Sequence, residues 1–468
     1  MRRKNSRECA PGYRVDFTNK PVCGWGGFLT FCQFLETLGV RGLLGQALPD
    51  GRTSPNQVPV VDIAMQLLAT FALGGSRFEH AGRITNDRVL QTILGIRRFG
   101  SPSSIRRYFS NLTQGQSEAI HQTLSKLVVS VLAGQRKSDV LDLDSTVFCR
   151  WGSQEGSSKG YNPLRKGRRS HHPLLAMLGE AKLIVHSWMR AGSASPHRGC
   201  REFLAETMAL LGDAIRITGV RADAGFYSNE FLLALESHGL AYAIAMQMSN
   251  SVKRWCAQIS TWQSVSPDIE VGEAFYHPFH WKAARRVIVI REAKRRQRKG
   301  VLFEIIDWEY RAIVTTMQEP ALEVWRFYNK RGDCENRIKE LKYDFNADGF
   351  CLHRFAGTEV VFRLNCFTFN LVSFYKTMVL EDTTITLSTI RTKVFVIGAI
   401  LGASGRTTVV RLGLVGKWRQ EFQRLLGRLA TFAHSTAAQL RNSFEPNALE
   451  APSCWRLRSP NYMRTTFN

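Results

Sequence analysis

Apolar residues recur at helical spacing through the first third of the chain. Residues 57–132 place them at i, i+3 and i+4, which gathers them on one face of each helix. A first helix stops at Gly74-Gly75, and a second begins where Ser101 precedes Pro102, a common helix start. The pattern therefore predicts a helical N-terminal region.

The second of these helices carries two arginines away from its apolar stripe. The stripe consists of Ile105, Tyr108, Phe109 and Leu112. Arg106 and Arg107 lie on the other side of the helix. A short helix with this pattern could be a recognition helix in a groove of DNA, or an ordinary surface helix. The sequence leaves both interpretations open.

The periodicity changes after residue 132. Residues 140–148 alternate as a strand does, and residues 172–189 predict a hairpin that turns at Gly179-Glu180. The next predicted elements are, in order, a helix at 201–212, a strand at 214–223, a helix at 231–239 and a strand at 241–248. This order predicts a mixed α/β sheet.

Strand-like runs dominate between residues 250 and 320. They are joined by a basic turn, AKRRQRKG, whose basic residues are Lys294, Arg295, Arg296, Arg298 and Lys299. We expect a β insertion whose basic tip either follows a DNA backbone or is simply solvated. Helical periodicity returns after residue 320 and continues into the C-terminal region.

The charge balance narrows the choice of partners. The 468 residues include 63 Lys and Arg against 39 Asp and Glu, a formal net charge of +24. Such a surface attracts polyanions, so nucleic acid is the expected partner. The alternative is a basic protein with no such partner.

The cysteines and apolar runs indicate the compartment. The ten cysteines include no C-x-x-C pair and no zinc-finger spacing, which is typical of a reducing compartment. The basic N-terminus has no apolar segment after it, and apolar runs such as 394–403 are too short to span a bilayer. We expect a soluble, cytoplasmic protein with no membrane partner.

Acidic residues lie on one face of the first predicted strand. Asp142, Asp144 and Thr146 share this face, while Leu141 and Leu143 share the other. An acid pair within a sheet is costly unless a positive charge lies beside it, and a strand is a rigid element on which to hold a divalent metal. The alternative is a strand end with solvated acids.

Asp223 lies where a predicted strand meets the glycine turn of RADAGF. Its carboxylate would emerge at the end of the strand. An Asp-x-Gly turn is common and means little alone. Beside the acids of the first strand it is informative, because open α/β sheets bind ligands at strand ends.

The stretch YNKRGDCENRIKE, residues 328–340, combines acids and bases on a predicted helix. At about 100° per residue, an apolar stripe faces the core: Cys334, Ile338, Leu341 and Phe345. The adjacent sector holds Tyr328, Arg331, Glu335 and Lys342. Asp333 and Glu340 fall outside it and are expected on the solvent side. Glu335 is thus the acid beside the core, flanked by two bases and a phenol.

Such a set of acids suits divalent cations. Two Mg²⁺ ions about 4 Å apart can activate one oxygen and stabilise the leaving one in phosphodiester cleavage. Mg²⁺ keeps waters and substrate oxygens, so two or three carboxylates suffice as protein ligands. A neighbouring Arg would hold a phosphate in bidentate fashion, and a Lys as a point charge.

One spacing in this stretch resembles a known signature. It is Tyr328-x2-Arg331-x3-Glu335-x6-Lys342, which resembles the Y-R-E-K signature of bacterial insertion-sequence DDE transposases. The sequences DST at 144–146 and DAGF at 223–226 are similar to the first and second Asp elements of that family. The resemblance implies an RNase H-like catalytic core, interrupted by a β insertion between the second Asp and the Glu.

The resemblance also implies residue roles. The implied ligands of two Mg²⁺ ions, for which Mn²⁺ can substitute, are Asp144, Asp223 and Glu335. The residues implied to hold phosphates of the transposon end are Tyr328, Arg331 and Lys342. Asp142 is the alternative first ligand or a partner of it, and the position of the following Thr favours Asp144.

A second basic run lies between the first strand and the hairpin, beside the proposed site. It consists of Lys159, Arg165, Lys166, Arg168 and Arg169. The neighbouring His171 and His172 could contact phosphates or be polar loop residues.

The sequence and the resemblance together predict five regions. They are a helical N-terminal DNA-binding region at 1–132, the first part of the core at 133–249, the β insertion at 250–320, the second part of the core with the Glu helix at 321–380, and a helical C-terminal region with a tail at 381–468.

The implied function is that of a DDE transposase. It would bind the terminal inverted repeats of its element and perform Mg²⁺-dependent cleavage and strand transfer into target DNA. The partner would be double-stranded DNA, bound by a homodimer at the bacterial nucleoid. The alternatives are an RNase H-fold nuclease that does not join DNA, and an inactive DNA-binding protein derived from a transposase.

Overall fold

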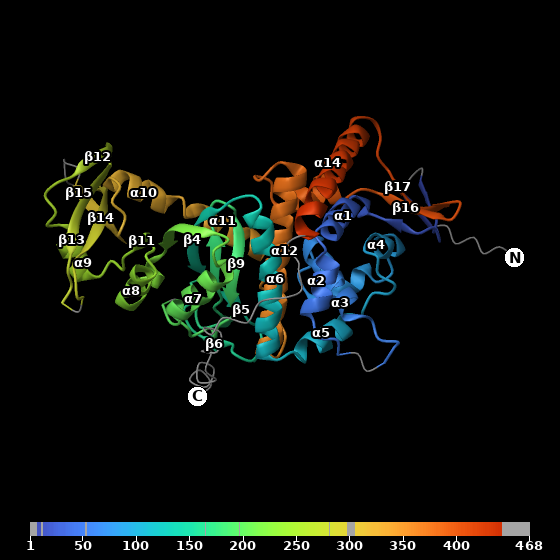
Figure 1. Cartoon of the computed structure of the whole chain (residues 1–468), viewed down its shortest axis with the longest axis horizontal. Helices are drawn as coiled ribbons and strands as arrows, with labels where there is room; N and C mark the ends of the chain where they lie inside the picture. Colours follow the sequence, from blue (N-terminus) through green and yellow to red (C-terminus); the bar gives the residue numbers. More distant parts are fainter. Residues whose placement is uncertain are drawn as a thin grey trace.

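The computed structural model describes residues 7–10, 13–51, 54–163, 165–195, 197–279, 281–296 and 305–441. The molecule is elongated (Figure 1). The strands of residues 263–315 form one end and the N-terminal helices form the other, with a sheet and long helices between them.

The central strands have the topology of an RNase H-like core. They are β4 (Ser138–Ser145), β8 (Leu174–Leu178), β9 (Leu183–Trp188), β10 (Arg216–Ala222) and β11 (Tyr242–Ala245). Their order is β9-β8-β4-β10-β11. β8 is antiparallel to β4 and β9, whereas β10 is parallel to both β4 and β11. The predicted mixed α/β core is confirmed.

Helices connect and cover these strands. α7 (Cys200–Leu211) contacts β9 on its way to β10, and α8 (Asn229–Ser237) joins β10 to β11. β4 is buried on both faces of its central residues, so Asp142 and Asp144 lie within the sheet layer. The ends of β4 and β10 therefore meet at one edge, where both strands deliver an Asp.

The strands predicted between residues 250 and 320 continue the same sheet. After α9 (Asn250–Cys256), they are β12 (Gln263–Ser266), β13 (Ile269–Tyr276), β14 (Arg285–Arg296) and β15 (Ile305–Thr315). β15 pairs antiparallel with β11, which gives a nine-stranded sheet within the described chain. α10 (Ala321–Asn329) contacts β11, β13 and β14. Where a domain boundary falls in this region stays a prediction.

Only part of the basic turn lies within the described residues. Lys294 is on β14 and pairs with Glu292 at 2.5 Å and Glu309 at 3.6 Å. Arg295 and Arg296 belong to β14, but their side chains fall outside the described part, as do Arg298 and Lys299 entirely.

The helical part of the molecule packs around α12 (Phe355–Tyr375). α12 contacts α3 (Val60–Ala72), α5 (Pro102–Ser110), α6 (Gln114–Ala133) and β9. Nearly all of its residues are buried, as expected for a helix covered on every side. The helices predicted within 57–132 are confirmed, including the Ser101 cap that accepts from the Ser104 N–H at 3.1 Å.

The C-terminal region is not wholly helical, which corrects the prediction for 381–468. α14 (Gly416–Arg441) is present and contacts α1 (Leu29–Thr37). Before it, β16 (Ala399–Ser404) and β17 (Thr407–Leu412) form a hairpin around Gly405, whose φ is +59°. β16 also pairs with β3 (Val22–Cys23) near the other end of the chain. β-branched residues in β17 and a distant partner strand favour the sheet here.

The stretch 328–340 is divided between two helices. α10 ends at Asn329, and α11 (Gly332–Tyr343) begins after Arg331. The apolar stripe is buried as predicted, and Asp333 is exposed. The solvent position predicted for Glu340 is wrong, because this residue is only 6% exposed.

Glu340 is buried because cations surround it. Its carboxylate accepts from Lys376 Nζ at 2.6 Å, Arg337 Nη1 at 2.7 Å and the Leu387 N–H at 3.0 Å. Burial lowers the pKa of Lys376, and the charge of Glu340 opposes that shift. This buried ion pair fixes α11 against the end of α12.

Replacing Lys376 tests this anchor. Lys376→Met should lower the free energy of unfolding by about 3 kcal/mol, because Glu340 loses a buried partner. Urea unfolding measures the loss, and adding Glu340→Gln should recover part of it. Lys417→Met is the control: it breaks an exposed pair with Glu421 and should change little. Equal losses in the two lysine variants would contradict a special role for the buried pair.

Candidate active site

Asp144 lies near the end of β4 and is only 7% exposed. One carboxylate oxygen accepts from the Ser145 N–H at 2.7 Å, and the other accepts from Arg331 Nη2 at 2.8 Å. Burial raises the pKa of Asp144 to about 7; Arg331 opposes this shift, and the charges of Asp223 and Glu335 add to it. Three acids thus act on one another at this point of the structure.

Asp223 follows β10, the strand parallel to and paired with β4. Its side chain accepts from the Gly225 N–H at 2.9 Å and caps the short turn that follows. The glycine turn therefore orients the carboxylate, as the sequence RADAGF suggested. Asp223 is half-buried at the same edge of the sheet as Asp144.

Glu335 approaches from α11 and reaches Asp144 through Arg331. Arg331 Nη1 donates to Glu335 at 2.8 Å, while its Nη2 binds Asp144. Although burial lowers it, the charges of Asp144, Tyr328 and Asp223 raise the pKa of Arg331 above its ordinary value. One guanidinium therefore bridges two of the three acids that the sequence predicted in one site.

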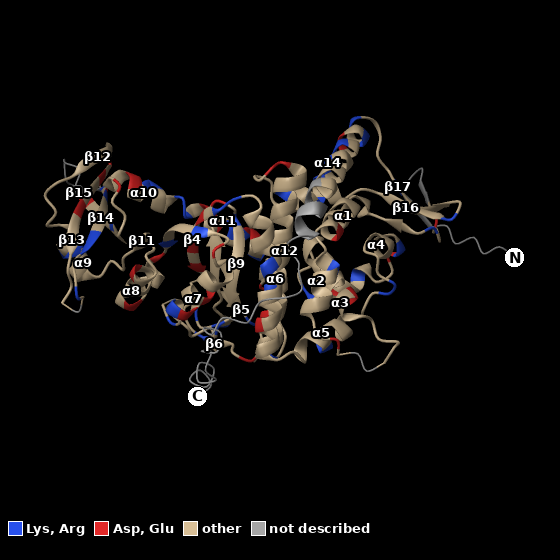
Figure 2. Cartoon of the chain, viewed as in Figure 1, with Lys and Arg blue, Asp and Glu red and all other residues tan. Residues whose placement is uncertain are grey.

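The break between α10 and α11 makes this bridge possible. Arg331 lies at the junction of the two helices and is only 8% exposed, whereas the Glu335 side chain remains 51% exposed. Figure 2 shows acidic and basic residues side by side around β4 and α11. An arginine in this position holds carboxylates of two separate elements together.

Two other residues of the signature lie close by. Tyr328 is half-buried at the end of α10, and burial raises the pKa of its phenol. Arg331 opposes that shift, and the charge of Asp223 adds to it. Lys342 on α11 donates to the Val147 carbonyl at 3.2 Å. The structure therefore places the predicted phosphate-holding residues around the acids.

Asp142 is fully buried and forms an ion pair with a different arginine, Arg221. Arg221 binds its two oxygens at 2.6 and 2.7 Å, and donates to the Phe327 carbonyl at 3.0 Å. Because Asp144, and not Asp142, shares its arginine with Glu335, this arrangement favours Asp144 as the functional acid of β4. Asp142 and Arg221 instead tie the sheet to the end of α10.

Arg221 was missed by the sequence reasoning. It lies on β10 opposite Asp142 of β4 in the strand register, two residues before Asp223. An arginine so placed beside an acid pair on the neighbouring strand was the available signal.

A cleft of about 1180 Å³ opens beside the acids. Its lining includes Asp223, Ser145, Thr146, Lys342 and Arg106. It therefore runs from the strand ends to α5.

The two arginines of α5 differ in their surroundings. Arg106 forms an ion pair with Glu79 and lies 5.7 Å from the ring centroid of Phe78. Arg107 is exposed. Only Arg106 lines the cleft, so the two arginines predicted to bind DNA do not share one surface.

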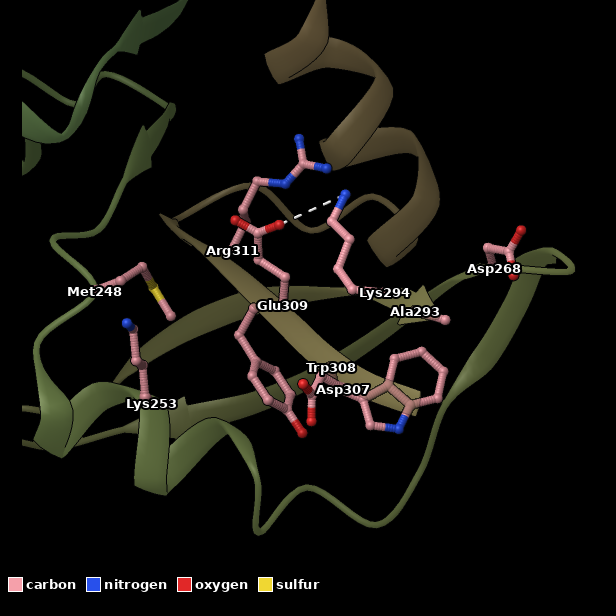
Figure 3. Close-up of a pocket in the computed structure, with 10 residues that line it drawn as sticks. Met248, Lys253, Asp268, Ala293, Lys294, Asp307, Trp308, Glu309 and Arg311 are labelled. Atoms are coloured by element: carbon pink, nitrogen blue, oxygen red, sulfur yellow. Dashed lines mark ion pairs between the residues drawn. The ribbon is translucent and has the colours of Figure 1, made fainter. Parts of the chain in front are cut away.

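A second pocket, of about 950 Å³, lies on the strands β14 and β15 (Figure 3). Lys294 and Glu309 face each other there, and Trp308 lies at the other side of the pocket. The pocket mixes both signs of charge and is separate from the acid cleft in its lining residues. Lys294, predicted to contact DNA, is therefore already paired with acids of its own sheet.

The carboxylates of Asp144, Asp223 and Glu335 are suitable ligands for a hard divalent cation. Carboxylate oxygens are the ligands that Mg²⁺ and Mn²⁺ prefer. Within the described ranges, no three Asp, Glu, His or Cys side chains are gathered closely enough to hold a metal. Arg331 supplies positive charge between Asp144 and Glu335.

In the part of the chain that the structure describes, no helix is long and apolar enough to cross a membrane.

The chain matches the family described as Transposase DDE domain group 1 over residues 9–434. It belongs to this family of DDE transposases, whose members are DNA-transposing enzymes that use divalent metal ions. The bacterial insertion-sequence origin and the Y-R-E-K subgroup stay predictions.

Among solved structures, the chain is similar to one titled "Cryo-EM structure of piggyBac transposase synaptic complex with hairpin DNA". The identity is 11%, the TM-score is 0.42, and the match covers 96% of this chain and 87% of that chain. This is a remote likeness, so the family membership rests on the sequence match. No curated protein matches the chain.

The bridge through Arg331 gives a testable expectation. Arg331→Met should lower the stability by about 3 kcal/mol, because it leaves Asp144 and Glu335 without their shared cation. Mg²⁺ or Mn²⁺ should then raise the melting temperature of this variant more than that of the wild type. Differential scanning calorimetry measures both effects.

The control is Arg326→Met, which breaks an exposed pair with Glu323 on α10 and should cost at most about 0.5 kcal/mol. A metal-dependent shift of the same size in both variants would show that Arg331 does not stand in for a cation.

Proposed function

We propose that this protein binds the terminal inverted repeats of its own element, cleaves the DNA at each end, and joins the freed 3′ ends to target DNA. The observation that carries the proposal is the bridge from Asp144 to Glu335 through Arg331, beside Asp223, which lines the cleft. Both reactions are in-line displacements at phosphorus, so one site can serve both.

Asp144, Asp223 and Glu335 are the proposed ligands of two Mg²⁺ ions, with Mn²⁺ as a substitute. Such ions, when bound, lower the pKa of a water and stabilise the leaving oxygen. The rigid strand ends hold the two aspartates, and α11 presents Glu335 from the solvent side. Burial is the main cause of the raised pKa of Asp144, and the charges of Asp223 and Glu335 add to it, so a bound cation would favour the ionised form.

The bases around the acids suit the phosphates of a DNA end. Arg331 has a planar group that can hold a phosphate in bidentate fashion once its carboxylates are neutralised otherwise. Lys342 and Arg106 both line the cleft, and Tyr328 lies beside Arg331. The +24 charge of the chain supports a double-stranded DNA partner.

Pairing of two transposon ends requires at least two copies of the protein, so we propose a homodimer on DNA. A nuclease that cleaves without joining has the same acids and is the second candidate. An inactive DNA-binding descendant is the third, and the presence of all three acids speaks against it.

Glu335→Gln tests the catalytic assignment. It should abolish both cleavage and joining while leaving the fold intact, because Glu335 is half exposed. The assay incubates labelled element ends and a plasmid with Mg²⁺ and resolves the products on a gel. Asp333→Asn, an exposed acid on the same helix, is the matched control and should keep activity. Undiminished activity of Glu335→Gln would overturn the assignment, and cleavage without joining by the wild type would identify a nuclease.

Lys342→Gln tests the electrostatic part of the proposal. It should reduce the slope of log affinity against log salt concentration by about 1, because it removes one phosphate contact. Lys339→Gln is the control, since Lys339 is exposed on the same helix but does not line the cleft. Fluorescence anisotropy over a salt series measures the slopes, and equal slopes for both variants would contradict a phosphate contact at Lys342.

A further inference from the structure

A small antiparallel sheet follows Asp144 directly. It consists of β5 (Phe148–Cys149), β6 (Ser158–Lys159) and β7 (Arg169–His171), and lies between β4 and β8 in the chain. We call these strands and their connections, residues 148–171, the side sheet. It belongs to neither the central sheet nor the β14–β15 hairpin.

The base of the side sheet is fixed to the core. Phe148 is fully buried and packs edge-on against Phe362 of α12 at 5.3 Å. Arg150 is buried and donates to His171 Nδ1 at 2.8 Å and to the Asp348 carbonyl at 2.5 Å. These contacts hold the side sheet in a defined position beside the acids.

Two large aromatic side chains of the side sheet are left open to solvent. Trp151 is 68% exposed and Tyr161 is 73% exposed. Both line the cleft that also contains Asp223 and Lys342. Aromatic rings in solvent gain nothing from the core, and beside an acid site they offer flat surfaces to a ligand that enters the cleft.

Positive charge lies beside Trp151. Residues 148–171 contain six Lys and Arg and a single Glu. The guanidinium carbons of Arg165 and Arg168 lie 4.8 and 4.0 Å from the ring centroid of Trp151. Neither arginine forms an ion pair with any acid among the described residues. A ligand for this surface therefore combines flat rings with negative charge.

Unpaired nucleotides have this chemistry. In a duplex the faces of the bases are already stacked on one another, so only a single strand or a frayed end presents them to a protein ring. Stacking of a base on an aromatic side chain tolerates any sequence, and arginines beside the ring hold the phosphates.

We propose that Trp151 and Tyr161 form a stacking platform for unpaired bases of the DNA strand that enters the acid cleft, with Arg165 and Arg168 holding its phosphates. This proposal rests on the proposed function, since it supplies the substrate strand with a binding surface next to Asp144. It assigns the side sheet to the recognition of single-stranded DNA at the cleavage position.

The test compares binding of three probes in EDTA, where no cleavage occurs. They are an oligothymidine about 16 nucleotides long, an abasic oligonucleotide of equal length, and a blunt duplex. Trp151→Ala and Tyr161→Ala should each weaken binding of the oligothymidine by about 5- to 100-fold. Binding of the abasic strand and of the duplex should change little, because their phosphate contacts remain. Trp151→Phe should restore most of the affinity.

A second readout reports stacking itself. An oligonucleotide with 2-aminopurine should lose fluorescence on binding the wild type, and lose less on binding Trp151→Ala. Trp418→Ala removes an equally exposed tryptophan from α14 and should behave like the wild type. If Trp151→Ala weakened all three probes equally, or left every affinity unchanged, the stacking platform would be refuted. Failure of the wild type to bind any probe would instead refute the proposed function.

Discussion

The site depends on one electrostatic constraint: three acids that lie close together require positive charge between them. Arg331 supplies it by binding Asp144 and Glu335 at once. The cost of burying Asp144 is visible in its raised pKa, which the neighbouring acids increase. Because Arg331 lies between α10 and α11, the position of both helices is coupled to the charge state of the strand ends. Arg331 offsets only part of the negative charge of the three acids, so the site favours further positive charge.

Two further buried arginine and lysine contacts keep this arrangement in register. Arg221 joins Asp142 to the last turn of α10, and Lys376, directly after α12, binds Glu340 of α11. The first contact therefore fixes the end of α10, which precedes Arg331, and the second fixes α11, which follows Arg331. Breaking either contact would leave a buried charge without a partner. The free-energy cost of such a charge is larger than the stabilisation that the intact ion pair provides. The positions of the helices beside Asp144 and Asp223 are consequently determined by contacts outside the site itself.

The alternation of residue types and the turn residues predicted those features that neighbouring residues in the chain determine. The alternation along β4 placed Asp142 and Asp144 correctly on one face, and the glycine turn placed Asp223 at a strand end. The break at Arg331 could not be read, because helical periodicity continues across it. Glu340 was misplaced because its partner Lys376 lies 36 residues later in the chain. β16 was missed for a similar reason, since its partner β3 comes from the opposite end of the chain. The spacing of the acids in the sequence indicated the chemistry of the site. The cations that bind these acids and Glu340 could not be assigned, because their partners are distant in the sequence.

The continuous sheet has a mechanical consequence. β14 is 12 residues long, which corresponds to about 40 Å of strand. It is joined to β10 through β15 and β11 without a gap, and α10 crosses the joint as a brace. A hydrogen-bonded sheet resists stretching far better than a linker does. The paired part of β14 and β15 therefore keeps a fixed distance from Asp223, whereas the sequence was equally compatible with a hinged domain.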